Sequence, residues 1–294
     1  MESAAADAST GTNGAADGVT GGAGPLLRHW RERAGLSQLE LALLADSSAR
    51  HISFVETGRS RPSPRMVLRL AEHLDVPVRE RNALLLAAGH APHYPETPVD
   101  APSLAALRGG LERMLTAYEP FPALVVDGRY EVVAANRGVA ALLEGVAGHL
   151  LRPPLNAMRL TLHPEGLAPR IHNLPQWRGH LLEQMRRQLA PLRSAPLREL
   201  YEEVAAYPPP RPDTGHTEHT GLTGLTEGRG AAGPCDPGPF ALPLVIGHRG
   251  HALSFFSTIT TFNTPMDVTV SELAMETFVP ADPRTAALLP ELLG

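Results

Sequence analysis

Three arginines, Arg50, Arg59 and Arg61, lie within twelve residues of one another in a basic part of the chain. A guanidinium is planar and donates two parallel hydrogen bonds, either to O6 and N7 of guanine or to a phosphate. Residues 25–94 contain ten arginines and seven acidic residues, within a chain whose net charge is −5. All 26 basic residues of the chain are arginine. A basic segment in an acidic chain indicates a polyanionic partner.

Histidine and cysteine offer a second chemistry, metal binding, which their spacing does not support. His-x-x-His pairs occur at 90–93, 216–219 and 248–251, in two Pro- or Gly-rich segments and one expected hairpin turn. Together with Cys235, the pair at 216–219 is one ligand short of a structural zinc site. A single cysteine excludes an intramolecular disulfide. The sequence has no phosphate-binding glycine loop and no nucleophile elbow, so we predict no metal, cofactor or catalytic residue.

Composition divides the chain into two folded units. Residues 1–24 lack periodicity and are predicted to be a disordered tail. Residues 90–102 hold four prolines and are predicted to be an extended linker. Seven prolines and seven glycines at 207–239 indicate a flexible insertion. The folded units are then residues 25–89 and 103–294.

The first unit is predicted to be all α, with five short helices. A capping box at residues 37–40 starts the second helix. The third helix covers about 48–57 and ends at Gly58, because glycine favours the left-handed backbone of a helix C-terminus. Pro64 and Pro77 start the fourth and fifth helices. A turn of about three residues joins the second and third helices, which is the helix-turn-helix arrangement.

This segment resembles the Xre (Cro/cI-type) DNA-binding domain. The resemblance rests on Gly35-Leu36-Ser37-Gln38, Leu41-Ala42, Ile52-Ser53, Val55-Glu56-Thr57-Gly58-Arg59 and Pro62-Ser63. The continuation from Met66 to Tyr94 is similar to the subfamily that joins this domain to an MmyB-like ligand-binding domain. In the turn, Asp46 and Ser47 stand where the family often has glycine and an apolar residue.

The resemblance implies that the third helix enters the major groove of DNA and reads bases near its N-terminal end. Arg50 is the strongest candidate for reading a base, and Ser48 and His51 would reach bases or phosphates. Gln38 matches the family position that meets the DNA backbone, and the other two arginines are placed to contact phosphates. The predicted DNA-binding residues are Gln38, Ser48, Arg50, His51, Arg59 and Arg61. The alternative is that these side chains form a solvated face.

The second unit is predicted to be α+β. A hairpin turns at Asp127-Gly128, helices follow, and a three-stranded meander with a last run over about 268–279 comes near the C-terminus. This order is similar to the PAS-like domain of the MmyB-like family. The similarity rests on Leu124-Val125-Val126-Asp127 through Asn136-Arg137 and on Leu253-Ser254-Phe255-Phe256-Ser257-Thr258.

Membership of that family implies an apolar cavity that holds a fatty-acid-like or other amphipathic small molecule. The residues suited to line it are Tyr130, Trp177, Leu181, Phe255 and Ile259. Arg178 is a candidate partner for a ligand carboxylate. The alternative is that the apolar residues are ordinary core and that Arg178 is a surface helix residue.

Together these features predict a multidomain fold, an all-α helix-turn-helix domain followed by an α+β PAS-like domain. The expected function is a cytoplasmic, sequence-specific regulator of transcription that binds a double-stranded DNA operator as a homodimer and responds to a ligand. In the alternative, the C-terminal domain only dimerises or binds a protein. A third possibility, an enzyme joined to a DNA-binding domain, is set aside because the sequence shows no set of catalytic residues. No apolar run approaches the ~18 residues of a membrane helix, and no secretory signal is recognised.

Overall fold

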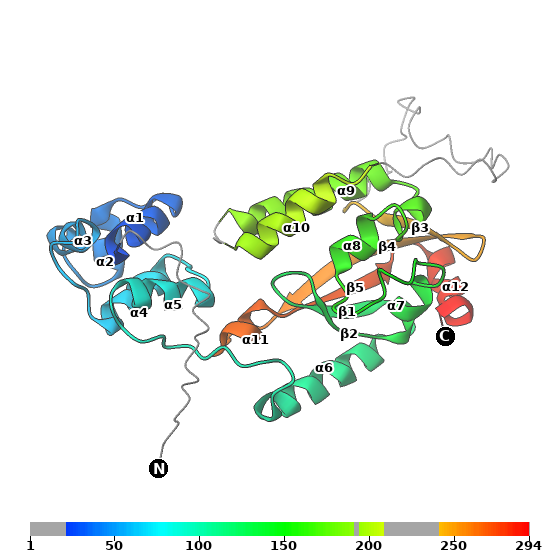
Figure 1. Ribbon diagram of the computed structural model, residues 1–294, viewed down its shortest axis with the longest axis horizontal. Coiled ribbons are helices and arrows are strands. Elements are labelled where there is room, and N and C mark those ends of the chain that lie inside the picture. Colours follow the sequence, from blue (N-terminus) through cyan, green and yellow to red (C-terminus); the bar gives the residue numbers. More distant parts are fainter. Residues whose placement is uncertain (1–21, 191–193, 209–240, 294) are drawn as a thin grey trace, which may run out of the picture. The chain divides into compact units, whose positions relative to one another are not determined.

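The computed structural model describes residues 22–190, 194–208 and 241–293. Most of the predicted tail (1–24) and of the predicted insertion (207–239) lies outside these residues. The chain forms two compact units, Met1–Pro95 and Glu96–Gly294 (Figure 1). Their boundary falls inside the stretch 90–102.

The N-terminal unit is built from five helices. They are α1 (Ala23–Arg33), α2 (Gln38–Leu44), α3 (Ala49–Glu56), α4 (Pro64–His73) and α5 (Val78–Ala87). The capping box is present: Ser37 Oγ accepts from the Glu40 amide, and the Glu40 carboxylate accepts from the Ser37 amide. Ser48 and Ser63 cap α3 and α4 through their side-chain oxygens, which accept from the amides of His51 and Met66. The predicted all-α helix-turn-helix fold is confirmed.

The turn between α2 and α3 has a left-handed residue where related domains often carry glycine. Asp46 has a φ of 46°, and the Ser47 amide donates to the Ala42 carbonyl oxygen at 2.8 Å. This backbone conformation is costly for residues with a Cβ atom, although aspartate tolerates it better than most. The turn therefore forms without glycine, with some backbone strain at Asp46.

Asp46→Gly is expected to raise the free energy of unfolding of this unit by about 0.5 kcal/mol, since glycine adopts positive φ freely. The matched control is Gly58→Ala, because Gly58 has a φ of 73° and an added Cβ would meet no atom within 4 Å. That variant should lose about 1 kcal/mol from backbone strain alone. Urea unfolding measures both. A destabilised Asp46→Gly protein would show that the aspartate side chain contributes more than its backbone costs.

The C-terminal unit is built around an antiparallel five-stranded sheet. Its strands are β1 (Ala123–Val126), β2 (Val132–Ala135), β3 (Leu244–His248), β4 (His251–Thr261) and β5 (Ala274–Pro280). They lie in the order β2-β1-β5-β4-β3. The last strand begins later than the run predicted at 268–279. Asp267 caps a short helix, α11 (Val268–Glu272), by accepting from the amides of Thr269 and Val270.

Helices cover the two faces of this sheet (Figure 1). Because side chains alternate along a strand, Val125 packs on one face and Leu124 on the other. Leu111 and Leu115 of α6 (Ala105–Ala117) pack against the first face. The helices that contribute to the core of the second face are α7 (Arg137–Leu142), α8 (Ala157–Leu162), α9 (Leu174–Leu189), α10 (Ala195–Ala205) and α12 (Pro283–Leu293). This arrangement confirms the predicted α+β class.

Each half of the stretch 90–102 is held by its own unit. In the N-terminal unit, the Asn82 side chain accepts from the amides of His93 and Tyr94 and donates to the Tyr94 carbonyl. In the C-terminal unit, Thr97 donates to Asp267 Oδ2 from its amide at 3.2 Å and from its hydroxyl at 2.6 Å. Because Asp267 also caps α11, which leads into β5, we call this contact the Thr97–Asp267 clasp.

Candidate DNA-reading surface and ligand cavity

The first turn of α3 presents polar side chains away from the core. Ile52 and Val55 are buried, whereas Ser48 and Arg50 are exposed and His51 is half-buried. Ser48 Oγ accepts from the His51 amide at 3.1 Å, which fixes the start of the helix. The predicted base-reading residues therefore lie together at one helix end.

Phe54 is a neighbour of this surface that the sequence analysis did not identify. The guanidinium carbon of Arg50 lies 5.2 Å from the centre of the Phe54 ring, and that of Arg59 lies 6.0 Å from it. A cation over an aromatic face is stabilised by about 0.5–1 kcal/mol at an exposed site. One ring thus holds two of the predicted DNA-binding arginines. The i, i+4 spacing of Arg50 and Phe54 was the signal that would have found it.

A buried carboxylate fixes the helices around α3. Glu56 accepts from Arg31 Nε at 2.6 Å and Nη2 at 2.9 Å, and from Gln38 Nε2 at 2.8 Å. Glu56 and Arg31 are only 7% and 8% exposed. The hydrogen bond to Glu56 raises the pKa of Arg31 above its usual value. These contacts join α1, α2 and α3, and they place the amide of Gln38 beside the acid.

Arg61 differs from the other two arginines in its contacts. Its Nε donates to the Ala88 carbonyl oxygen at 2.7 Å, and its Nη2 donates to the Gly89 carbonyl oxygen. The side chain therefore ties the segment after α3 to the C-terminal end of α5. Arg50 and Arg59 instead rest on an aromatic ring.

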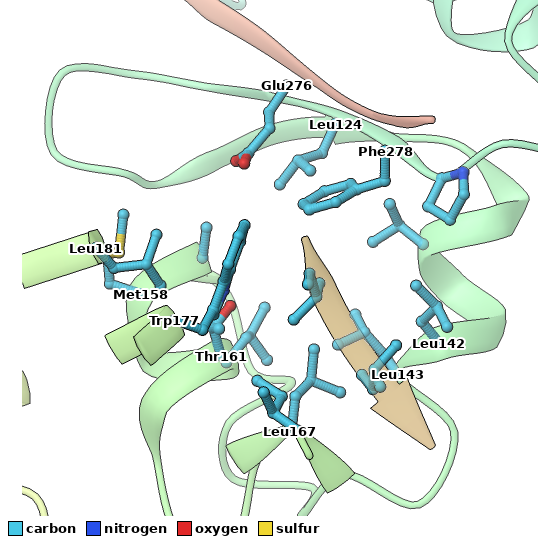
Figure 2. Close-up of a pocket in the computed structure, with 17 residues that line it drawn as sticks. Leu124, Leu142, Leu143, Met158, Thr161, Leu167, Trp177, Leu181, Glu276 and Phe278 are labelled. Atoms are coloured by element: carbon cyan, nitrogen blue, oxygen red, sulfur yellow. The ribbon is translucent and has the colours of Figure 1, made fainter. Parts of the chain in front are cut away.

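An apolar cavity of about 70 Å³ lies between the sheet and the helices of the C-terminal unit (Figure 2). Trp177 and Leu181, both predicted to line a cavity, border it from α9. The side chains around them are mostly aliphatic or aromatic, among them Leu124, Leu142, Met158, Leu167 and Phe278. An apolar cavity of about 150 Å³ holds a benzene molecule. A longer ligand would therefore require these side chains to move apart.

The remaining predicted ligand residues lie elsewhere. Tyr130 and Phe255 are buried in the same core but do not border the cavity. Ile259 lies on β4 and is 51% exposed. Arg178 Nη2 donates to the Ala205 carbonyl oxygen at 2.8 Å and so links α9 to α10. Trp177 and Leu181, predicted from the spacing of apolar residues along one helix, border the cavity, whereas Phe255 and Ile259, predicted on a strand, do not.

Two polar residues border the cavity that the sequence analysis did not name, Thr161 and Glu276. Glu276 lies on β5, two residues before Phe278, so both side chains point to the same face. In Figure 2 the Glu276 carboxyl group points toward the interior of the cavity. The signal that would have found Glu276 is the alternation of side chains between the two sheet faces along residues 274–280, which places it on the same face as Phe278.

A second, polar hollow of about 270 Å³ is also bordered by α8. Arg159 forms an ion pair with Glu203, with Nη2–Oε2 at 2.6 Å and Nε–Oε1 at 2.8 Å. Tyr207 Oη donates to Glu203 Oε1 at 2.5 Å. Arg152 and His163 are among the other residues that border this hollow.

The part of the chain that the structure describes also bears on metal ligands and membrane-spanning helices. There, no three His, Cys, Asp or Glu side chains group as metal ligands would, and no helix is long and apolar enough to cross a membrane. His216, His219 and Cys235 lie outside the described residues.

Comparison with known proteins gives two family matches. A helix-turn-helix domain family matches residues 23–84, and the MmyB-like transcription regulator ligand binding domain family matches residues 107–292. No curated protein matches the chain. A solved structure of an RNA-binding Light-Oxygen-Voltage receptor is 14% identical over 92% of this chain, with a TM-score of 0.27, which is too low to establish a shared fold. This chain spans 61% of that receptor chain.

The ligand-binding domain match covers more than half of the chain and contains the sheet, the helices and the cavity described above. The helix-turn-helix match contains α3 and its exposed arginines. The chain therefore belongs to the MmyB-like transcription regulator family and is a DNA-binding transcription regulator with a C-terminal ligand-binding domain.

Proposed function

We propose that the protein binds a double-stranded DNA operator as a homodimer and that a small amphipathic, fatty-acid-like molecule in the apolar cavity changes its affinity for DNA. It catalyses no reaction in this proposal. The observation that carries it is the pairing of an exposed, arginine-bearing helix end in one unit with an apolar cavity in the other.

On DNA, Arg50 would read guanine through O6 and N7, and Ser48 and His51 would contact a neighbouring base or phosphate. Arg59 and Gln38 would contact the phosphate backbone. Arg61 would add a backbone contact while holding the end of α5. One such unit covers about half of an operator, which supports a dimer on two half-sites.

The Thr97–Asp267 clasp supplies a route from the cavity to the other unit. Glu276 and Phe278 of β5 border the cavity, and the chain before β5 is α11 with its cap Asp267. Asp267 holds Thr97, the second residue after the unit boundary. A ligand that displaces β5 would move this clasp and shift the population of dimers whose two α3 helices fit the operator.

The first experiment selects bound fragments from random DNA duplexes, because it yields both the operator and the spacing of its half-sites. A homodimer predicts two inverted half-sites about one helical turn apart. If no sequence is enriched even at low salt, sequence-specific DNA binding is wrong.

A cavity-filling variant tests ligand control. Ala157 borders the cavity, so Ala157→Leu should leave the operator affinity unchanged but abolish its response to added octanoate, octanol or octylamine. In the unmodified protein at least one of these probes should change that affinity by about 5-fold or more. Ala140→Leu, at an exposed position on α7, is the matched control and should respond normally. Fluorescence anisotropy of labelled operator DNA measures all three proteins.

The alternative function, a C-terminal domain that only dimerises the protein, predicts different results. The unmodified protein would ignore every probe, and native mass spectrometry would show a dimer without a bound small molecule. Both results together would replace the ligand-controlled regulator with this alternative.

A further inference from the structure

Glu276 is the one residue with an ionisable side chain among the described residues that border the apolar cavity. Glu276 is half-buried and borders this space from β5. A carboxyl group in an apolar cavity is costly unless it has a hydrogen-bonding or charged partner. It is therefore the feature of the cavity that would select a ligand by its polar end.

The sheet register holds this carboxyl group in place. Glu276 lies opposite Leu124 of β1 and Ile259 of β4, so a slip by one residue would replace it with Met275 or Thr277. Ser257, on the neighbouring strand, donates to Glu276 Oε1 at 2.5 Å. The acid is thus part of the fold and is not a surface side chain that happens to reach the cavity.

No positive charge balances this acid within the described part of the chain. Arg178, the predicted partner of a ligand carboxylate, is bonded to the Ala205 carbonyl oxygen instead. Tyr130, buried in the same core, interacts electrostatically with Glu276, but burial raises the pKa of Tyr130 to about 12, so its hydroxyl stays neutral. Burial also raises the pKa of Glu276 above its usual value, and the hydrogen bond from Ser257 offsets this only in part.

These contacts discriminate between ligands with different polar ends. A carboxylate would bring a second acidic group beside Glu276 in an apolar space, where the two groups cannot both be ionised, so one of them must take up a proton at a cost in binding free energy. An alcohol would form an ordinary hydrogen bond. An ammonium group would donate a charge-assisted hydrogen bond to the ionised form of Glu276, and its positive charge would balance the carboxylate.

We propose that the cavity selects an apolar molecule that carries a primary amine, with Glu276 accepting a hydrogen bond from the ammonium group. This inference rests on the proposed function, because it requires that the cavity holds a ligand. It changes the expected polar end from the carboxylate of a fatty acid to an amine.

The test compares octylamine, octanol and octanoate, which share one apolar chain. Trp177 borders the cavity and Trp30 lies in the other unit, and these are the two tryptophans of the chain. The indole N–H signal of Trp177 in the full-length ¹⁵N-labelled protein, assigned with Trp30→Phe, reports binding. Octylamine should bind about ten-fold more tightly than octanoate, with octanol between them.

Glu276→Gln keeps the shape of the side chain and an oxygen for Ser257 but cannot ionise. It should abolish the preference for octylamine and leave the affinity for octanol nearly unchanged. Glu199→Gln, at an exposed position on α10, is the matched control and should retain the preference. The comparison of the three probes in the unmodified protein stands even if Glu276→Gln does not fold.

Each remaining outcome has a distinct meaning. Equal affinities, or tighter binding of octanoate, would overturn the amine inference and leave the cavity as a ligand site. Octanoate binding that is lost in Arg159→Gln would place a carboxylate in the polar hollow and would also overturn it. If no probe shifts the Trp177 signal, the cavity is not a ligand site and the proposed function fails with the inference.

Discussion

Replacing Glu56 with alanine is expected to lower the free energy of unfolding of the helix-turn-helix unit by about 3–5 kcal/mol. The substitution leaves the Arg31 guanidinium buried with one hydrogen bond, to the Leu36 carbonyl oxygen, and with only the exposed Glu32 as a charged neighbour, at 3.8 Å from Nη2. It also removes the acceptor of Gln38. Urea unfolding followed by Trp30 fluorescence in a Trp177→Phe background measures this unit alone, because Trp30 belongs to its core.

Two further variants make the Glu56 experiment specific. Glu72→Ala removes an exposed acid on α4 and should change stability by less than about 0.5 kcal/mol. A double variant, Arg31→Met with Glu56→Leu, removes both charges and should recover most of the loss, because no charge is then buried without a partner. A loss below about 1 kcal/mol in Glu56→Ala would show that water reaches Arg31 and that the pair is not structural.

Arg50→Ala is expected to weaken operator binding by about 1–3 kcal/mol and to relax the base preference at one position of each half-site. The reason is that the planar guanidinium can bond O6 and N7 of one guanine together. Binding to all single-base variants of the selected operator measures the effect. The other positions should keep their preferences.

Arg59→Ala is the matched comparison, since Arg50 and Arg59 both rest on Phe54 and each variant loses one such contact. It should weaken binding to all sequences equally and reduce the slope of log affinity against log salt by about one unit. Arg61→Ala is less suitable, because it also releases the carbonyl oxygens of Ala88 and Gly89. If the Arg50 and Arg59 variants behave alike, the division between base and phosphate contacts is wrong.

Local signals made the helix-turn-helix unit predictable from the sequence. Ser37, Ser48 and Ser63 cap helices because a side-chain oxygen satisfies backbone amides within three residues. Gly58 ends α3 with a positive φ for the same local reason. At Asp267 the local signal was missed: this residue caps α11, so the residues after it, three of which are β-branched, form a helix. The last run of the meander had been predicted over about 268–279.

Contacts between distant residues were not predictable in this way. Strand β1 pairs with β5, about 150 residues later, and this pairing brings Glu276 beside Leu124. The alternation along β5 can be read from the sequence, but which part of each sheet face the helices cover cannot. Both Trp177 and Ile259 were predicted to line a cavity; Trp177 borders it, whereas Ile259 on β4 is half-exposed.

The Thr97–Asp267 clasp also has a consequence for how operator binding and ligand binding affect each other. If the clasp transmits ligand occupancy to the DNA-binding unit, thermodynamic reciprocity requires that operator DNA change the affinity for the ligand by the same factor. Protein bound to its operator would then be half-occupied by the ligand at a different ligand concentration from protein that is free of DNA. The threshold of the response would be set by the promoter as well as by the pocket.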